Sequence, residues 1–119
     1  MDVRRWHEEN VEELTPGIGR QAHHTGRLTV ARIFLGQGAV VPEHSHEHEQ
    51  VATVLEGRLR FRIEDAETIL AKDETIVVPS GARHTVEALE DSLVLDVFAP
   101  ARDDWIRGDD AYLRSPVDG

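Results

Sequence analysis

Three histidines and a glutamine are spaced so that they could bind a metal ion. His44 and His46 are two residues apart, Gln50 follows shortly after, and His84 comes from a distant part of the chain. In an extended strand, residues two apart project from the same face, so we expect the first two imidazoles to lie side by side. Imidazole nitrogens with one amide oxygen suit a divalent ion such as Zn, Ni, Fe, Mn or Cu, and the donor types do not decide among them. The alternative is that His44 and His46 are surface histidines near a sheet edge.

A second chemically active position is an acidic residue inside an apolar strand. Alternation in residues 93–99 places Val94, Asp96 and Phe98 on one face. A carboxylate in such a strand is costly to bury unless it pairs with a cation or hydrogen-bond donor or takes part in the function of a site. Asp96 could therefore pair with an arginine, face solvent at an edge, or lie in the lumen near the metal. We favour the lumen, where burial would raise the pKa of Asp96 and a cation would lower it.

These residues need a framework of short strands to bring them together. Turn residues punctuate the middle of the chain at roughly eight- to twelve-residue intervals, which favours an all-β barrel or sandwich. The predicted strands are residues 28–35, 51–55, 58–63, 67–70, 75–78, 84–88 and 93–99.

Two of these segments carry further expectations. Residues 58–63 alternate apolar residues with arginines, so the apolar set should face the core and the arginines water. Residues 75–78 are predicted to form a buried strand.

Pro100 should end the barrel, and residues 103–107 should form a short terminal turn or helix. The first dozen residues and the last six should lie over the surface.

Composition narrows the class of protein. The 119 residues fit one domain, 1–119, with a barrel core at about 19–102. No cysteine is present, which excludes disulfides and thiolate sites. The formal net charge of −10 shows no basic stripe for nucleic acid, and no apolar run could span a membrane. The N-terminus has basic residues but no following apolar segment, so we expect a cytoplasmic protein without a secretory signal.

The metal-binding residues occur within two motifs that resemble those of the cupin family. The spacing from Gly38 through the two histidines and Gln50 to Gly57 is similar to the first cupin motif, and residues 79–84, Pro-Ser-Gly-Ala-Arg-His, resemble the core of the second. The resemblance covers about residues 19–102. It implies a single-domain cupin, a double-stranded β-helix or jelly-roll barrel, with one divalent metal ion on His44, His46, Gln50 and His84.

The sequence departs from the cupin pattern in three places. Gln50 stands where Glu is usual, Asp73-Glu74 replaces Gly-Asp, and Ala88 replaces Asn. A neutral amide leaves the ion its full positive charge, which makes it a stronger Lewis acid. The substitution also removes a carboxylate that some cupin dioxygenases use.

The other histidines are expected outside the metal site. His48 shares strand parity with His44 and His46, but it lies in the presumed turn between two glutamates, so we expect it at the rim rather than as a fifth ligand. His7, His23 and His24 are expected at the surface, and the alternative is that His23 or His24 adds a ligand to the metal site.

A closer resemblance involves the last predicted strand. The pattern Asp96-x-Phe98-x-Pro-x-Arg102, after the metal-binding residues, is similar to the uronate-linearising cupins of pectin and alginate breakdown, the KdgF type. The resemblance implies a lyase- or isomerase-type reaction that opens 4,5-unsaturated uronates to a linear keto acid. The metal would polarise substrate oxygens, Asp96 would relay a proton, Arg102 would pair with the sugar carboxylate and Phe98 would shape the pocket wall.

Other functions remain open at the sequence level. A metal-dependent dioxygenase or polyketide-cyclase-like cupin would use a similar site, and a wide apolar lumen would favour it. A non-catalytic cupin that binds a sugar or small acid would show affinity without turnover, and a purely structural role is the fourth reading. In each ligand-binding case the partner is a small molecule. Because a lone barrel has exposed strand edges, we also expect a C₂ homodimer.

Overall fold

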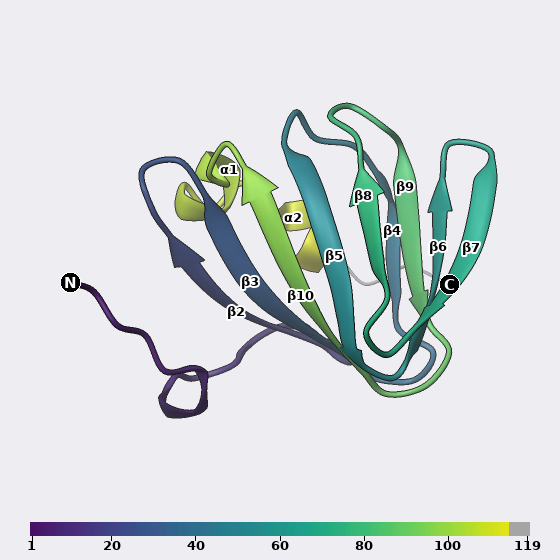
Figure 1. Cartoon of the computed structure of the whole chain (residues 1–119), viewed down its shortest axis with the longest axis horizontal. Helices are drawn as coiled ribbons and strands as arrows, with labels where there is room; N and C mark the ends of the chain where they lie inside the picture. The colour runs from purple at the N-terminus through teal and green to yellow at the C-terminus, as the bar shows by residue number, and fades with distance from the viewer. Residues whose placement is uncertain (115–119) are drawn as a thin grey trace.

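The computed structural model describes residues 1–114, and most of these residues are in β-strands (Figure 1). The strands form a six-stranded sheet in the order β1-β2-β3-β10-β5-β8 and a four-stranded sheet in the order β4-β9-β6-β7. All pairs are antiparallel, and the two sheets enclose the core as a jelly-roll barrel. The predicted all-β fold is confirmed.

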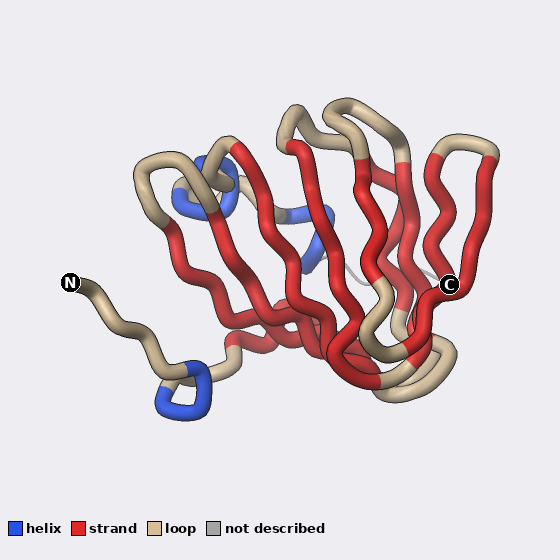
Figure 2. The backbone as a smooth tube through the Cα atoms, in the orientation of Figure 1, coloured by secondary structure: helices blue, strands red, loops and turns tan. Residues whose placement is uncertain are grey.

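The element bounds are as follows. The strands are β1 Glu12–Thr15, β2 Ile18–His24, β3 Thr29–Leu35, β4 Val40–His44, β5 Glu49–Glu56, β6 Arg58–Ile63, β7 Ala66–Ala71, β8 Thr75–Val78, β9 His84–Ala88 and β10 Ser92–Ala99. The helices are a 3₁₀ turn η1 at Trp6–Glu8, α1 at Asp103–Ile106 and α2 at Ala111–Arg114 (Figure 2).

Each strand predicted from the sequence is present, with ends that differ by no more than a few residues. The prediction that residues 75–78 form a buried strand is wrong. Within residues 1–114, β8 pairs with β5 alone and forms the edge of the six-stranded sheet, so its outer hydrogen-bonding edge is unpaired. Val77 is 53% exposed, and only Val78 of this strand is buried. An apolar run alone does not distinguish a central strand from an edge strand.

The first residues of the chain are tied to the outer side of β2. The Gln21 side-chain amide donates hydrogen bonds to the carbonyls of Trp6 and Glu9. The Trp6 ring stacks on His23 with centroids 4.0 Å apart, and His23 Nε2 lies 2.8 Å from Glu9 Oε2. His23 is therefore largely covered, contrary to its predicted surface position, whereas His24 is exposed as predicted.

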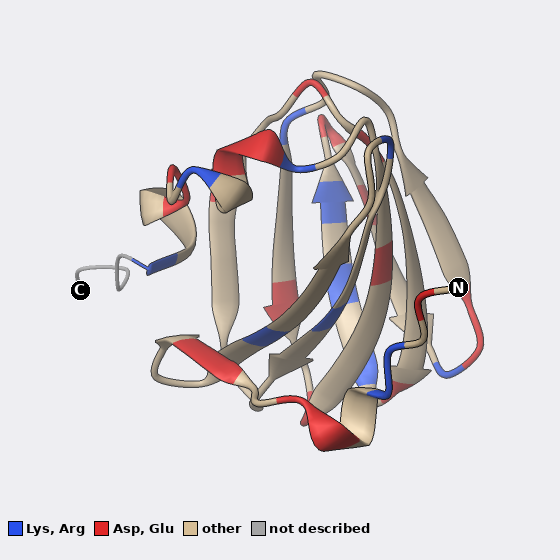
Figure 3. Cartoon of the chain, turned by 90° about the vertical axis from the view of Figure 1, so that its left-hand side faces the viewer, with Lys and Arg blue, Asp and Glu red and all other residues tan. Residues whose placement is uncertain are grey.

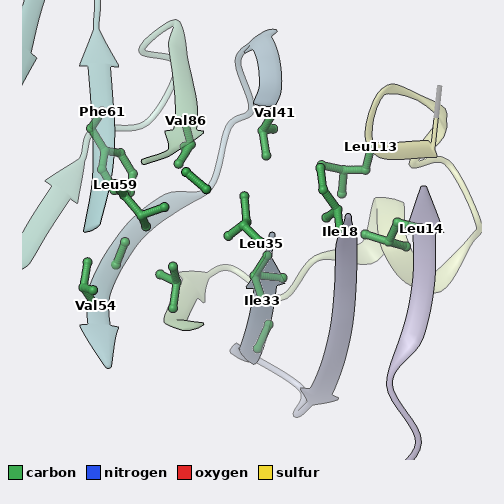
Figure 4. Packing of buried hydrophobic residues seen from close by; sticks show 14 of the residues in the cluster. Leu14, Ile18, Ile33, Leu35, Val41, Val54, Leu59, Phe61, Val86 and Leu113 are labelled. Atoms are coloured by element: carbon green, nitrogen blue, oxygen red, sulfur yellow. The ribbon is translucent and has the colours of Figure 1, made fainter. Parts of the chain in front are cut away.

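Apolar residues from both sheets fill the barrel (Figure 4). Leu59 and Phe61 of β6 point inward as predicted and are almost completely buried. At the other side of the core, Figure 4 places the side chain of Leu113 beside those of Ile18 and Leu14. The core therefore extends to the C-terminal segment, which is packed as part of the barrel.

After β10 the chain continues as a short segment that contains α1 and α2 (Figures 1 and 3), and α2 lies against β1 and β4, an edge strand of each sheet. The predicted helix at residues 103–107 is present as α1, while α2 was not predicted. Acidic and basic residues alternate along this segment (Figure 3). Of the last six residues, predicted to lie over the surface, Arg114 ends α2 and residues 115–119 lie outside the described part.

None of the helices in residues 1–114 has both the length and the hydropathy needed to cross a bilayer.

Candidate metal centre

Three histidine side chains meet inside the barrel. Antiparallel pairing of β4 with β9 places His44 directly opposite His84. We expected His44 and His46 on one strand, but β4 ends at His44 and His46 lies in the loop that follows. The loop nevertheless brings the His46 ring next to the rings of His44 and His84. One ring nitrogen from each of the three residues lies within 4.8 Å of the others. The three imidazoles therefore form a group that could hold a metal ion.

A backbone carbonyl orients each of the three rings. The Nδ1 atoms of His44, His46 and His84 lie 2.8, 2.9 and 2.9 Å from the carbonyl oxygens of Pro42, His48 and Ala82. A carbonyl oxygen only accepts hydrogen bonds, so in the neutral ring Nδ1 carries the proton and Nε2 keeps its lone pair. This arrangement is typical of histidines that bind metals through Nε2.

Burial keeps these imidazoles neutral. Desolvation lowers the pKa of both His44 and His46 to about 4, and it also lowers the pKa of His84. Metal binding requires the neutral imidazole, so the site holds its histidines in the binding form at neutral pH.

Gln50 supplies a fourth donor atom to the same place. Its Oε1 lies 3.2 Å from His46 Nε2, while its amide nitrogen donates to Asp96 Oδ1 at 3.1 Å. With the His46 proton on Nδ1, two acceptor atoms face each other here, which is unfavourable unless a cation lies near both. The donor set of three imidazoles and one amide oxygen fits a divalent metal ion.

Asp96 lies in the wall of the same cavity, as predicted, and its side chain is buried. Burial raises the pKa of this carboxyl to about 7, although the Gln50 amide and the positive charge of Arg102 oppose the shift. The hydrogen-bond partner of Asp96 is Gln50, not an arginine. A buried carboxyl that can gain or lose a proton near neutral pH thus lies next to the candidate metal ligands.

Arg102 is buried and firmly held. Its Nε and Nη2 donate to the two carboxylate oxygens of Asp104 at 3.0 and 2.8 Å. The guanidinium lies 4.7 Å from the centre of the Phe98 ring and 4.4 Å from that of Trp105. Asp104 therefore already takes the two-pronged contact that the family resemblance assigned to a substrate carboxylate.

The comparison with family models now identifies the fold family. A model described as a cupin domain matches residues 31–98, which carry all four candidate ligands and Asp96. The chain belongs to the cupin family. A search of curated protein sequences found no match.

Solved structures agree with this assignment. The present chain is 36% identical to KdgF from a Halomonas species, and the two structures match with a TM-score of 0.81 over 85% of this chain and 94% of that one. An RmlC-like cupin from Shewanella frigidimarina is 25% identical, with a TM-score of 0.82 over 86% and 93% of the two chains. Oxalate decarboxylase of Bacillus subtilis, whose Mn(II) centres have been studied, shares the fold at 21% identity and a TM-score of 0.71, over 76% of this chain and 27% of that one.

The cavity of this cupin is small and mostly apolar. Its volume is about 50 Å³. The four candidate ligands share its wall with Asp96, Phe98, Arg102 and the apolar residues Leu14, Ile18, Ile33, Leu35, Val41, Phe61, Val86, Val94, Trp105 and Leu113. The predicted site residues are thus brought together in one cavity.

Sequence reasoning missed the contribution of the C-terminal segment to the cavity. Tyr112 lies with its ring 4.8 Å from that of His44, and its hydroxyl accepts a hydrogen bond from Arg102 Nη2 at 2.6 Å. The one available signal was composition, because the chain has a single tyrosine and two tryptophans, and Trp105 and Tyr112 both follow Arg102 closely.

The predicted rim position of His48 is wrong. Its side chain is only 5% exposed, and its ring centroid lies 5.5 Å from that of His46. Its backbone carbonyl accepts the hydrogen bond from His46 Nδ1. The three-histidine group does not include His48, whose main chain instead orients one of the candidate ligands.

Proposed function

We propose that this cupin is a metal-dependent enzyme that opens the ring of a 4,5-unsaturated uronate to give a linear keto acid. The observation that carries the proposal is Asp96, a buried carboxyl hydrogen-bonded to Gln50 in the cavity of the three histidines. The 36% identity to Halomonas KdgF over nearly all of that chain supports it. So does the placement of Phe98 and Arg102, the other two residues of the KdgF-type pattern, in the same cavity.

The metal ion would be held by His44, His46, Gln50 and His84. When bound, it would polarise substrate oxygens and so stabilise negative charge that develops on them. The rest of the proposed chemistry belongs to side chains of the protein.

The reaction is an isomerisation in which the atoms of the substrate are rearranged. The proton leaves the hemiacetal hydroxyl as the bond between that carbon and the ring oxygen breaks, which gives an aldehyde and an enolate. The enolate becomes a ketone when a proton is added to the neighbouring carbon of its double bond. Asp96 would accept the proton from the hemiacetal hydroxyl and return it to the carbon, a task suited to a buried carboxyl that lies beside the candidate metal ligands in the cavity wall.

Two further residues would orient the substrate. Arg102 would contribute positive charge toward the substrate carboxylate. Phe98, which is buried and lies against both Arg102 and Trp105, would form the wall against which the sugar ring packs. Both roles are assigned from the KdgF-type resemblance.

The test is turnover by the purified protein loaded with one divalent metal at a time. The assay follows the loss of ultraviolet absorbance of the conjugated double bond in an unsaturated uronate. We expect acceleration over the spontaneous reaction that disappears with a chelator. Asp96→Asn should lower kcat by about 100-fold or more, because proton transfer by a positioned side chain contributes on this order.

Asp103→Asn is the control, because this neighbouring acidic residue is exposed and lies outside the cavity lining. It should retain full activity. No acceleration by fully metal-loaded protein would refute the proposal. Binding of the uronate without turnover would instead indicate a sugar-binding cupin.

One alternative is a dioxygenase or polyketide-cyclase-like reaction on an aromatic or enol substrate. The apolar character of the cavity favours it, but the small volume does not match the wide lumen that this alternative called for. Iron-loaded protein that consumes oxygen with a phenolic or enolic substrate would support it.

A further inference from the structure

We propose that Tyr112 is a specificity-determining residue whose hydroxyl, together with Arg102, selects substrates that carry a carboxylate. The inference rests on the proposed function, since it describes how the same cavity would recognise a sugar acid. Neither the sequence motifs nor the KdgF-type pattern includes this residue.

Hydrogen-bond donors converge at the Tyr112 hydroxyl. Its oxygen accepts from Arg102 Nη2 at 2.6 Å and from Trp105 Nε1 at 3.5 Å. Both partners are nitrogen donors, so the phenol proton is not used in either bond. Among residues 1–114 no acceptor receives that proton, and it remains for an acceptor outside the protein.

Arg102 has unused donors at the same place. Asp104 and Tyr112 occupy its Nε and Nη2, and within the described chain Nη1 makes no hydrogen bond. A ligand carboxylate could therefore accept from Arg102 Nη1 and from the Tyr112 O–H. A ligand with a neutral hydroxyl in place of the carboxylate would carry no negative charge to pair with the guanidinium and these two donors, so it should bind more weakly.

The tyrosine is also placed beside the candidate metal ligands. Its ring lies against that of His44 with centroids 4.8 Å apart, and both residues line the cavity. An anion held at its hydroxyl would thus lie close to the group that could hold the metal. This proximity suits a small acid whose carboxylate is near the reacting atoms.

The neighbouring residues fix α2 in this position. Leu113 is buried in the core beside Ile18. Asp110, only 1% exposed, lies 2.9 Å from both Arg20 and Arg114. These contacts define where the hydroxyl lies when the segment is packed on the barrel.

The first experiment uses the fact that the protein has one tyrosine. Tyrosine labelled with ¹³C in the ring gives signals from this residue alone in zinc-loaded protein, where zinc is diamagnetic. D-galacturonate, a saturated acid that has no double bond to react, is compared with D-galactose, its neutral counterpart. We expect galacturonate to shift the tyrosine signals and to bind about tenfold more tightly than galactose.

The second experiment measures both affinities by calorimetry in Tyr112→Phe, which keeps the ring and removes the hydroxyl. Galacturonate should bind about tenfold more weakly, as expected for the loss of a hydrogen bond to a charged group, while galactose binding stays unchanged. Ile106→Ala, a change at a 57% exposed position of the same segment, is the control and should leave both affinities as they are.

Three results would overturn the inference: equal affinities for the two sugars in the unaltered protein, an unchanged preference in Tyr112→Phe, or an equal loss of both affinities. These outcomes are separable from those of the proposed function. Selection of the carboxylate without turnover of the unsaturated uronate would support the role of Tyr112 and refute the proposed reaction. Turnover together with an unchanged preference in Tyr112→Phe would support the reaction and refute the role of Tyr112.

Discussion

At the residue scale, the candidate site contains ionisable groups whose pKa values burial has moved in opposite directions. The pKa of His44 and His46 is lowered to about 4, whereas that of Asp96 is raised to about 7. At about pH 6 the metal-free protein therefore holds neutral imidazoles and a mostly protonated carboxyl. A bound cation favours the carboxylate form, so it should lower the pKa of Asp96 below this pH.

Metal binding at about pH 6 should consequently release close to one proton, and that proton should come from Asp96. Calorimetric titration with zinc in two buffers that differ in ionisation enthalpy counts the protons released. Asp96→Asn, which retains a polar group of the same size, should bind zinc with almost no release. Equal proton release by the variant would show that the proton comes from the histidines instead.

The sequence was sufficient to identify the candidate ligands because they fall in two short motifs. It could not show why their geometry is favourable. The carbonyls that orient the rings belong to Pro42, His48 and Ala82, and nothing in the identity of those residues marks them for the task. Tyr112 was missed for a related reason, since it reaches the site through the path of the C-terminal segment and not through a strand pattern.

At the element scale, the turn between β5 and β6 depends on a glycine. Gly57 has a φ of +91°, and a Cβ built there would lie 2.4 Å from the carbonyl oxygen of Asp91 and 2.8 Å from the Cα of Ser92. These are backbone atoms of the strand junction that cannot easily move aside. Only a residue without a side chain fits both the conformation and the space.

Gly57→Ala should therefore destabilise the protein by about 3 kcal/mol or more, the sum of left-handed strain and overpacking. Gly38→Ala is the matched control, because Gly38 also has a positive φ, of 87°, but no atom lies within 4 Å of its built Cβ. It should cost about 1–2 kcal/mol, from strain alone. Urea unfolding of both variants tests this, and equal losses would disprove the role assigned to crowding.

The C-terminal segment is held by an ionic network centred on Asp110. This buried carboxylate bridges Arg20 and Arg114, and both arginines also contact Glu12 at the start of β1. The guanidinium of Arg20 additionally lies 4.5 Å from the centre of the Trp105 ring. Removing the charge of Asp110 would leave a buried arginine with one partner fewer, which is unfavourable.

Asp110→Asn should therefore loosen the segment over the cavity and speed the removal of bound metal by a chelator about tenfold or more. Asp109→Asn makes the same chemical change next door, where the side chain is 74% exposed, and it should leave the rate unaltered. Stopped-flow measurement with a chromogenic chelator gives both rates. If the two variants lose metal equally fast, Asp110 does not hold the segment closed.

A strand could be predicted where its own residues alternate between apolar and polar types. It could not be predicted where its buried residues are polar and find their partners far away in the sequence. β6 alternates cleanly and was predicted with its correct ends. β2 was missed because it buries Arg20 and Gln21, which look like surface residues. Their burial is compensated by Asp110 and by the carbonyls of Trp6 and Glu9, and this pairing is visible only in the folded chain.

At the scale of the whole molecule, we propose a homodimer formed through the outer face of the six-stranded sheet. Along β10 the side chains of Leu93, Leu95 and Val97 point away from the core and are only partly covered. The outer face continues to the sheet edge at β8, where Val77 is exposed. Polar residues, among them Arg32 opposite Leu95, interrupt this face, but its apolar part next to an open edge is still costly to leave in water.

Analytical ultracentrifugation should detect a dimer of the unaltered protein and a monomer for Leu95→Glu. Ile69→Glu is the control, because Ile69 is 45% exposed on β7 of the other sheet, and this variant should remain dimeric. Since each chain carries a formal charge of −10, added salt should strengthen the dimer by screening repulsion. A monomeric unaltered protein at micromolar concentration would refute the proposal.

The volume of the cavity has a consequence for the speed of the proposed reaction. About 50 Å³ accommodates only a few water molecules, whereas an engineered cavity that binds benzene has a volume of about 150 Å³. A sugar acid is larger than benzene, so the segment from Arg102 to Arg114 would have to swing aside to admit it and again to let the product go. The frequency of this opening, and with it the viscosity of the solvent, would then limit turnover together with proton transfer.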